Sequence, residues 1–234
     1  QSCAAASGTR MPRTTRPTNT IAIVRMTRSR ASGRATLPAR TLPRSNTMST
    51  AIRPVLYTIG HSTRAAEELI EVLDSAAIEC LVDVRGIPRS RTNPQFNQDV
   101  LPDTLAEASI DYVHLPVLGG RRGRFRSVDE RVNGGWTQRA FHNYADYALT
   151  PRFGEGLDQL LAMTVRRTCA IMCAEAVWWR CHRRIIADHV LAHGIRVVHL
   201  LTARKHEVAS MTAFAVAMGA LVSYPAATSR KSRS

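Results

Sequence analysis

The chain has 234 residues, of which 44% are hydrophobic, and this is enough for one domain with a buried core. Its longest apolar run (211–224) is shorter than the roughly 20 residues that span a bilayer. The formal net charge is +14, but residues 1–53 hold ten arginines and no acidic residue, whereas residues 54–229 hold 19 basic and 18 acidic residues. The composition therefore excludes a membrane partner and predicts no basic nucleic-acid-binding surface on the domain itself.

The segment 1–53 is rich in Arg, Ser, Thr, Ala and Pro and has no periodic apolar pattern beyond 21–24. Such a composition cannot offset the entropy of an ordered chain, so we expect a disordered basic arm. It is interpreted as a nucleic-acid-binding arm, as a transit peptide, or as sequence upstream of a natural start at Met48. The third interpretation is favoured because Met48 lies just before the first predicted strand. We expect residues 54–224 to form the domain and residues 225–234 a flexible basic tail.

Strand and helix patterns alternate through the domain. In chain order the sequence predicts strand 55–59, helix 64–76, strand 78–84, helix 97–108, strand 112–115, a long loop 121–135, helices 136–149 and 153–163, strand 168–174, helix 181–193, strand 196–200 and helix 206–218. Strands separated by helices favour right-handed parallel crossovers. The predicted fold is therefore a single α/β domain with a mainly parallel five-stranded sheet and helices on both faces.

Polar residues cluster where four of these strands end. In a parallel sheet, ligands bind outside the carboxyl ends of the strands, so these clusters are the candidate site. The candidate catalytic residues are His61, Asp83, Glu175 and Cys181. The candidate substrate-binding residues are Ser62, Arg85, Gly119, Gly120, His182 and Arg183.

Several of these residues also have a purely structural interpretation. Asp83 and Arg85 lie two residues apart on a strand, so their side chains share one face and can form a structural ion pair. His61 can cap a helix or donate to a loop carbonyl. Glu175, in contrast, places a charge at the end of an apolar strand, which would be costly to bury without a purpose.

The five cysteines follow no disulfide spacing, which favours a reducing, cytoplasmic location. Cys181 opens a predicted helix and is the best nucleophile candidate, whereas Cys173 is interpreted as a packed strand residue or a resolving partner. A zinc site built from Cys173, Cys181, His182 and a distant histidine stays open, but the sequence predicts no metal ligand set and no cofactor. It contains neither a phosphate-binding lysine loop nor a dinucleotide glycine fingerprint.

Five motifs resemble one known family. They are Tyr57-Thr-Ile-Gly-His-Ser62; Asp83-Val-Arg85 with Pro88 and Ser90; Leu118-Gly-Gly-Arg-Arg122; Tyr144-Ala-Asp-Tyr147; and Cys173-Ala-Glu-Ala-Val-Trp-Trp-Arg-Cys-His-Arg183. In this order, over residues 56–201, they resemble the family called domain of unknown function 488. The resemblance implies a compact α/β domain without a settled reaction. Some members look like companions of DNA-repair or iron–sulfur genes, and such an association defines no mechanism.

Three hypotheses for function follow. The favoured one is a small hydrolase-like enzyme acting on a nucleotide or nucleic acid, with Asp83 and Glu175 cleaving an N-glycosidic bond. The second is a thiol-dependent enzyme using Cys181. The third is a noncatalytic binding module, for which we expect no pocket at the strand ends. The sequence defines no oligomeric state.

Overall fold

A computed structural model describes residues 53–226 of the chain. The predicted arm, apart from Arg53, lies outside these residues, and so does the expected start at Met48. Residues 227–234 of the predicted tail also lie outside them. Within the part that is described, no helix is both long and apolar enough to cross a membrane.

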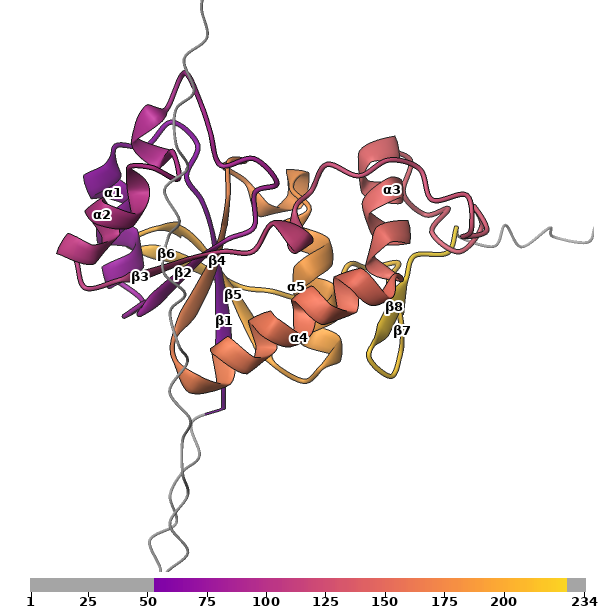
Figure 1. Cartoon of the computed structure of the whole chain (residues 1–234). Helices are drawn as coiled ribbons and strands as arrows, with labels where there is room; N and C mark the ends of the chain where they lie inside the picture. Colours follow the sequence, from indigo (N-terminus) through magenta and orange to yellow (C-terminus); the bar gives the residue numbers. More distant parts are fainter. Residues whose placement is uncertain (1–52, 227–234) are drawn as a thin grey trace, which may run out of the picture. The chain divides into compact units, whose positions relative to one another are not determined.

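The domain is built on a six-stranded sheet with the strand order β3-β2-β4-β1-β5-β6 (Figure 1). The strands are β1 (Val55–Gly60), β2 (Cys80–Asp83), β3 (Asp111–His114), β4 (Cys169–Cys173), β5 (Arg196–Thr202) and β6 (Lys205–Val208). The first five are parallel to one another, as the sequence predicts, and β6 pairs with β5 in the antiparallel direction.

Helices cover both faces of the sheet, which confirms the predicted architecture. On one side of the sheet lie α1 (Ala66–Asp74) and α2 (Leu101–Glu107). On the other side lie α3 (Arg139–Ala148), α4 (Pro151–Arg166) and α5 (Arg183–Ala192) (Figure 1). Three 3-10 turns, η1 (Pro94–Phe96), η2 (Pro116–Leu118) and η3 (Trp178–Arg180), lie in the connections.

The central strand β4 separates two hydrophobic cores. All five of its residues are buried. Cys169 and Ile171 face the core under α3, α4 and α5, whereas Ala170 and Met172 face the core under α1 and α2. This alternation is the two-residue period of a strand that is buried on both faces. Strand β4 is therefore the central strand that the sequence predicts at 168–174.

The predicted helix 206–218 is wrong. Its first residues form β6, and its last residues form β7 (Val216–Met218), which pairs with β8 (Leu221–Ser223) around Gly219 at φ +61°. The segment has helix-forming alanines and methionines, but pairing with the edge of β5 outweighs this weak local propensity. The backbone N–H of Lys205 donates to Thr202 Oγ1 (3.1 Å) and helps close the turn between β5 and β6.

Four predicted helices (α1, α2, α3 and α5) begin later than expected, and one of these shifts affects the site. Helix α2 begins at Leu101, because residues 97–100 form a turn. Helix α5 begins at Arg183, so Cys181 and His182 lie in the turn before it rather than inside its first turn. The expected activation of Cys181 by the first turn of a helix therefore has to be replaced by contacts with specific side chains.

Buried histidines couple this fold to pH, and two of them lie on β5 and α5. His199 on β5 hydrogen bonds through Nδ1 to Thr58 Oγ1 (2.8 Å) and stacks on Trp178 with ring centroids 4.3 Å apart. His189 on α5 packs against Phe153 at 4.9 Å. Burial lowers the pKa of each histidine to about 4, so both are neutral at pH 7 in the folded protein.

We expect the protein to lose stability as the pH falls from about 6.5 to about 4. In this window the unfolded histidines, with an ordinary pKa of about 6.5, bind protons that the folded ones do not, which costs up to roughly 3 kcal/mol for each histidine. Urea unfolding at pH 7 and pH 4.5 measures the loss. His199→Gln should reduce it, whereas His206→Gln, at an exposed position, should leave it unchanged; equal pH dependence in all three proteins would contradict the prediction.

Candidate functional site

A pocket of about 820 Å³ lies beyond the carboxyl ends of β1, β2 and β4. Its walls come from the segments that follow these strands, from the loop after η2 and from the first half of α3. Eight of the ten predicted site residues line it: His61, Ser62, Arg85, Gly119, Gly120, Glu175, Cys181 and His182. The other two, Asp83 and Arg183, are buried behind the wall, with exposed fractions of 0% and 1%.

A close backbone approach at Gly60 joins two of these walls. A Cβ atom at Gly60 would lie 1.9 Å from the carbonyl oxygen of Glu175 and 2.8 Å from Arg183 Nη2. The backbone N–H groups of His61 and Ser62 donate to the carbonyls of Cys173 and Ala174 at 3.0 Å each. Glycine at this position therefore allows the segments after β1 and β4 to run side by side into the pocket.

Asp83 and Arg85 form the buried ion pair that their spacing predicts. Arg85 Nε donates to both carboxylate oxygens of Asp83 (2.9 and 3.0 Å), and Arg85 Nη2 donates to Oδ2 (2.5 Å). The Tyr112 hydroxyl also donates to Asp83 (2.7 Å). Burial alone would lower the pKa of Arg85, but the hydrogen bonds and charge of Asp83 outweigh it and raise that pKa. Protein groups therefore donate to both oxygens of the Asp83 carboxylate, and this carboxylate holds the Arg85 guanidinium at the wall of the pocket.

His61 holds the same guanidinium from the other side. The geometry assigns a proton to its Nδ1, which donates to the carbonyl of Ser62 (2.9 Å), and Nε2 then accepts from Arg85 Nη1 (3.1 Å). The ring packs on Phe96, with centroids 4.2 Å apart. Burial, assisted by the charge of Arg85, lowers the pKa of His61 to about 4. His61 is thus neutral at pH 7 and orients Arg85.

Glu175 has a different environment from Asp83. Glu175 is exposed in the pocket. Its side chain forms no salt bridge with any residue that the structure describes. Its backbone carbonyl accepts a hydrogen bond from Arg183 Nη2 (2.6 Å), which anchors the segment. The carboxylate is therefore available to a ligand.

Cys173, Cys181 and His182 form a compact cluster in the pocket wall. His182 Nδ1 lies 3.5 Å from Cys181 Sγ and 3.8 Å from Cys173 Sγ, and its Nε2 lies 3.2 Å from the carbonyl oxygen of Val84. Burial raises the pKa of the Cys181 thiol, but a hydrogen bond with Cys173 and the neighbouring His182 and Arg183 outweigh it and lower that pKa well below its ordinary value. Arg183 Nε donates to Cys181 Sγ (3.4 Å).

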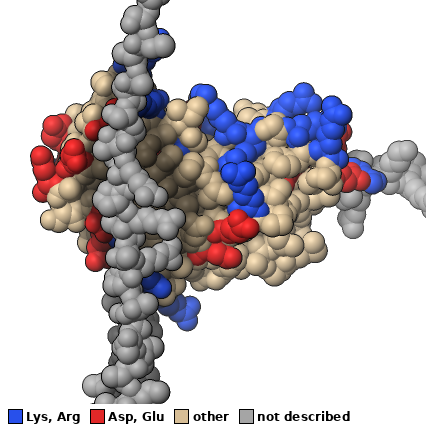
Figure 2. All heavy atoms as spheres, in the orientation of Figure 1, with Lys and Arg blue, Asp and Glu red and all other residues tan. Residues whose placement is uncertain are grey.

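Four arginines that the sequence does not single out line the pocket together with the predicted Arg85. They are Arg89, Arg121, Arg122 and Arg180. Glu175 is the one carboxylate among the described lining residues. Arg121, Arg122 and Arg180 lie inside the motifs that resemble the family, and their position beside the glycines and the tryptophans is the sequence signal that could have identified them. Figure 2 shows Lys and Arg gathered toward the upper right of one face, and acidic side chains along the left edge that carries α1 and α2.

The fold and the pocket define a class of protein: an α/β domain with a cationic site at the carboxyl ends of parallel strands. Residues 65–190 match the family described as Domain of unknown function DUF488, and these residues are more than half of the chain, which therefore belongs to this family. The Tyr57–Ser62 motif lies before the matched residues. Comparison with curated proteins finds no match, and neither does comparison with solved structures.

The two carboxylates should respond differently to neutralisation. We expect Asp83→Asn to lower the free energy of unfolding by about 3–5 kcal/mol, because it leaves Arg85 as a buried charge without its partner. Glu175→Gln should change it by no more than about 0.5 kcal/mol, because Glu175 is exposed. Urea unfolding at pH 7 measures both. Equal losses in the two variants would show that Glu175 also belongs to a structural ion pair.

Proposed function

We propose that the pocket is the active site of a hydrolase-like enzyme that acts on a phosphate-bearing substrate, a nucleotide or a nucleic acid. The observation that carries the proposal is the combination of five arginines, one carboxylate and a thiol–imidazole cluster in one concave pocket of about 820 Å³. This volume falls within the usual range for small-molecule sites, and pockets with converging charged groups are the usual location of active sites in α/β sheets.

The arginines supply the recognition of phosphate. Four of the five N–H groups of Arg85 donate to Asp83, to His61 or to the carbonyl oxygen of Phe96. One N–H group on Nη1 is therefore left without a partner among the described residues. Arg121 and Arg180 are exposed at the rim of the pocket. A guanidinium binds phosphate through paired N–H groups, and several guanidinium groups together balance the two negative charges of a phosphate dianion. Arg122 donates to the carbonyl oxygens of Pro116, Val117 and Gly119 and stacks over Tyr147 (3.8 Å), so it shapes the loop.

Glu175 is the proposed catalytic residue. In the cleavage of an N-glycosidic bond, the Glu175 carboxylate takes a proton from a water molecule, and the oxygen of this water bonds to the sugar C1′. The C1′–N bond breaks at the same time, and the base leaves with the electron pair and gains a proton. Asp83 takes no part in this step in our proposal. It acts through Arg85, as a positioning residue, and His61 has the same role.

Thiol chemistry is the second candidate function. It is favoured by the short distances within the cluster, where the sulfur and nitrogen atoms of Cys173, Cys181 and His182 all lie within 4.8 Å of one another. Such an arrangement suits a nucleophilic thiolate with a resolving partner. The binding-module hypothesis instead predicts a filled interior at the strand ends, where the structure has the pocket.

A nucleotide should bind in the pocket through the rim arginines. We expect nucleoside monophosphates to raise the melting temperature, and Arg121→Gln and Arg180→Gln each to weaken binding about 10-fold or more, because a hydrogen bond to a charged group contributes about 1.5–3 kcal/mol. Calorimetric titration measures the affinity. Glu175→Gln should keep the binding and lower the rate of base release about 100-fold or more.

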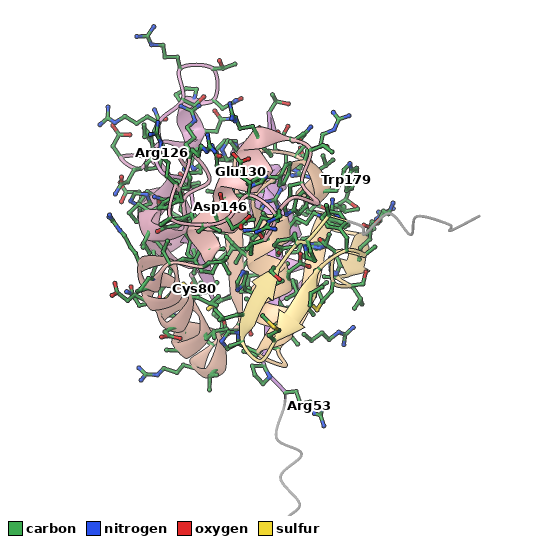
Figure 3. All side chains as sticks on the ribbon, turned by 90° about the vertical axis from the view of Figure 1, so that its right-hand side faces the viewer. Arg53, Cys80, Arg126, Glu130, Asp146 and Trp179 are labelled. Carbon is green, nitrogen blue, oxygen red and sulfur yellow. The ribbon has the colours of Figure 1, made fainter. Side chains whose placement is uncertain are left out.

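Arg126→Gln is the matched control for the rim variants. Arg126 lies in the same loop region as Arg121, is exposed and does not line the pocket; Figure 3 shows it at the outer edge of the domain. It should bind nucleotides like the unchanged protein. The proposal is contradicted if no nucleotide or short DNA raises the melting temperature, or if Arg126→Gln weakens binding as much as Arg121→Gln does.

A further inference from the structure

We propose that Cys173, Cys181 and His182 bind one zinc ion, with the fourth coordination position open to the pocket. This inference goes beyond the proposed function, because metal binding is tested by itself and holds whether or not the substrate is a nucleotide. The three residues come from the end of β4 and from the turn that precedes α5. All three line the pocket.

The distances between the donor atoms fit a single tetrahedral ion. Zinc binds sulfur at about 2.3 Å and imidazole nitrogen at about 2.0–2.1 Å, so tetrahedral angles place sulfur and nitrogen about 3.6 Å apart. The observed distances from His182 Nδ1 are 3.5 Å to Cys181 Sγ and 3.8 Å to Cys173 Sγ. All three donor atoms lie within 4.8 Å of one another. Little movement is needed for them to share an ion.

The imidazole is oriented as a ligand. His182 Nε2 donates to the carbonyl oxygen of Val84 (3.2 Å), which leaves the lone pair of Nδ1 directed at the two sulfurs. A hydrogen bond from the second ring nitrogen to a carbonyl is the usual support of a metal-bound histidine. The ring also packs near Tyr144, with centroids 5.1 Å apart, and against Gly120, where a Cβ atom would lie 2.4 Å from Nδ1.

One of the two sulfurs, Cys181 Sγ, lies beside a positively charged group. Cys173 and Cys181 are buried, and Arg183, whose side chain is also buried, donates from Nε to Cys181 Sγ (3.4 Å). An arginine N–H directed at a sulfur stabilises a thiolate, which is the form that binds metal. Among the residues that the structure describes, no other histidine, cysteine or carboxylate joins the three donors. Three protein ligands beside a pocket are the pattern of a catalytic zinc site, whose fourth ligand is water or substrate.

A second pair of cysteines in the same domain lacks these features. Cys80 and Cys169 are paired in register on β2 and β4, and both are fully buried in the core. No histidine joins them in a donor cluster in the described chain. Figure 3 shows Cys80 toward the end of the domain where Arg53 lies, lower than Trp179. Cys80→Ala is therefore a matched control, because it removes a buried thiol without affecting the proposed ligands.

The test is metal binding by the full-length protein. Purified protein should contain about one zinc per chain by elemental analysis. After removal of zinc with a chelator, added Co²⁺ should produce the intense near-ultraviolet absorption of thiolate-to-cobalt charge transfer and visible bands typical of a tetrahedral ion. Cys173→Ser, Cys181→Ser and His182→Gln should each lose the zinc or bind it at least roughly 100-fold more weakly. Cys80→Ala should keep one zinc per chain.

Gly120→Ala tests the site without changing a ligand. Its methyl group would force the His182 ring to move, so we expect zinc affinity to fall about 10- to 100-fold, the usual effect of disturbing the support of a ligand. The spectrum of the unchanged protein decides the matter even if a variant fails to fold. A protein that binds no zinc and gives no thiolate–cobalt absorption, or that is isolated with Cys173 and Cys181 joined as a disulfide, would overturn the proposal.

Discussion

The register of three adjacent parallel strands is the constraint on which the site depends. Strand β4 pairs with β1 so that Cys173 lies opposite Gly60, and it pairs with β2 so that Met172 lies opposite Asp83. The three strands therefore end at nearly the same level, and the segments that follow them enter one pocket. A slip of one residue in β4 would turn its side chains to the opposite faces and exchange the contents of the two cores.

Buried polar groups behind the pocket hold its surface in place. Asp83 and His61 fix one guanidinium, that of Arg85, and Arg183 fixes the segment of Glu175 and contacts Cys181. Neither Asp83 nor Arg183 lines the pocket, yet each determines where a lining group lies. Ion pairs of this kind contribute little net stability, because desolvation offsets their attraction, but they are costly to break. Their value here is the rigid placement of groups that touch the ligand.

Much of the fold follows from local patterns in the sequence, and the exceptions have physical causes. The five parallel strands are short apolar runs bounded by helical repeats, and the polar residues at their ends meet because parallel strands end at a common edge. The residues after Thr202 gave a helical pattern, but pairing with β5 and a turn at Gly219 depend on tertiary contacts that the local pattern does not contain. The rim arginines Arg121 and Arg180 were missed because they lie in segments without periodicity, where only the folded loops bring them together. Asp83 was correctly matched with Arg85, but the sequence could not show that Tyr112, 29 residues away, would complete its hydrogen bonding.

The central claim is that this pocket binds a phosphate-bearing ligand beside Glu175, and a crystal structure of the protein with a bound nucleoside monophosphate tests it most directly. We predict that the phosphate lies within hydrogen-bond distance of Arg85 Nη1 and of the rim arginines Arg121 or Arg180, and that the sugar lies beside the Glu175 carboxylate. A nucleotide bound elsewhere on the domain, with the pocket closed by its own side chains, would contradict the account.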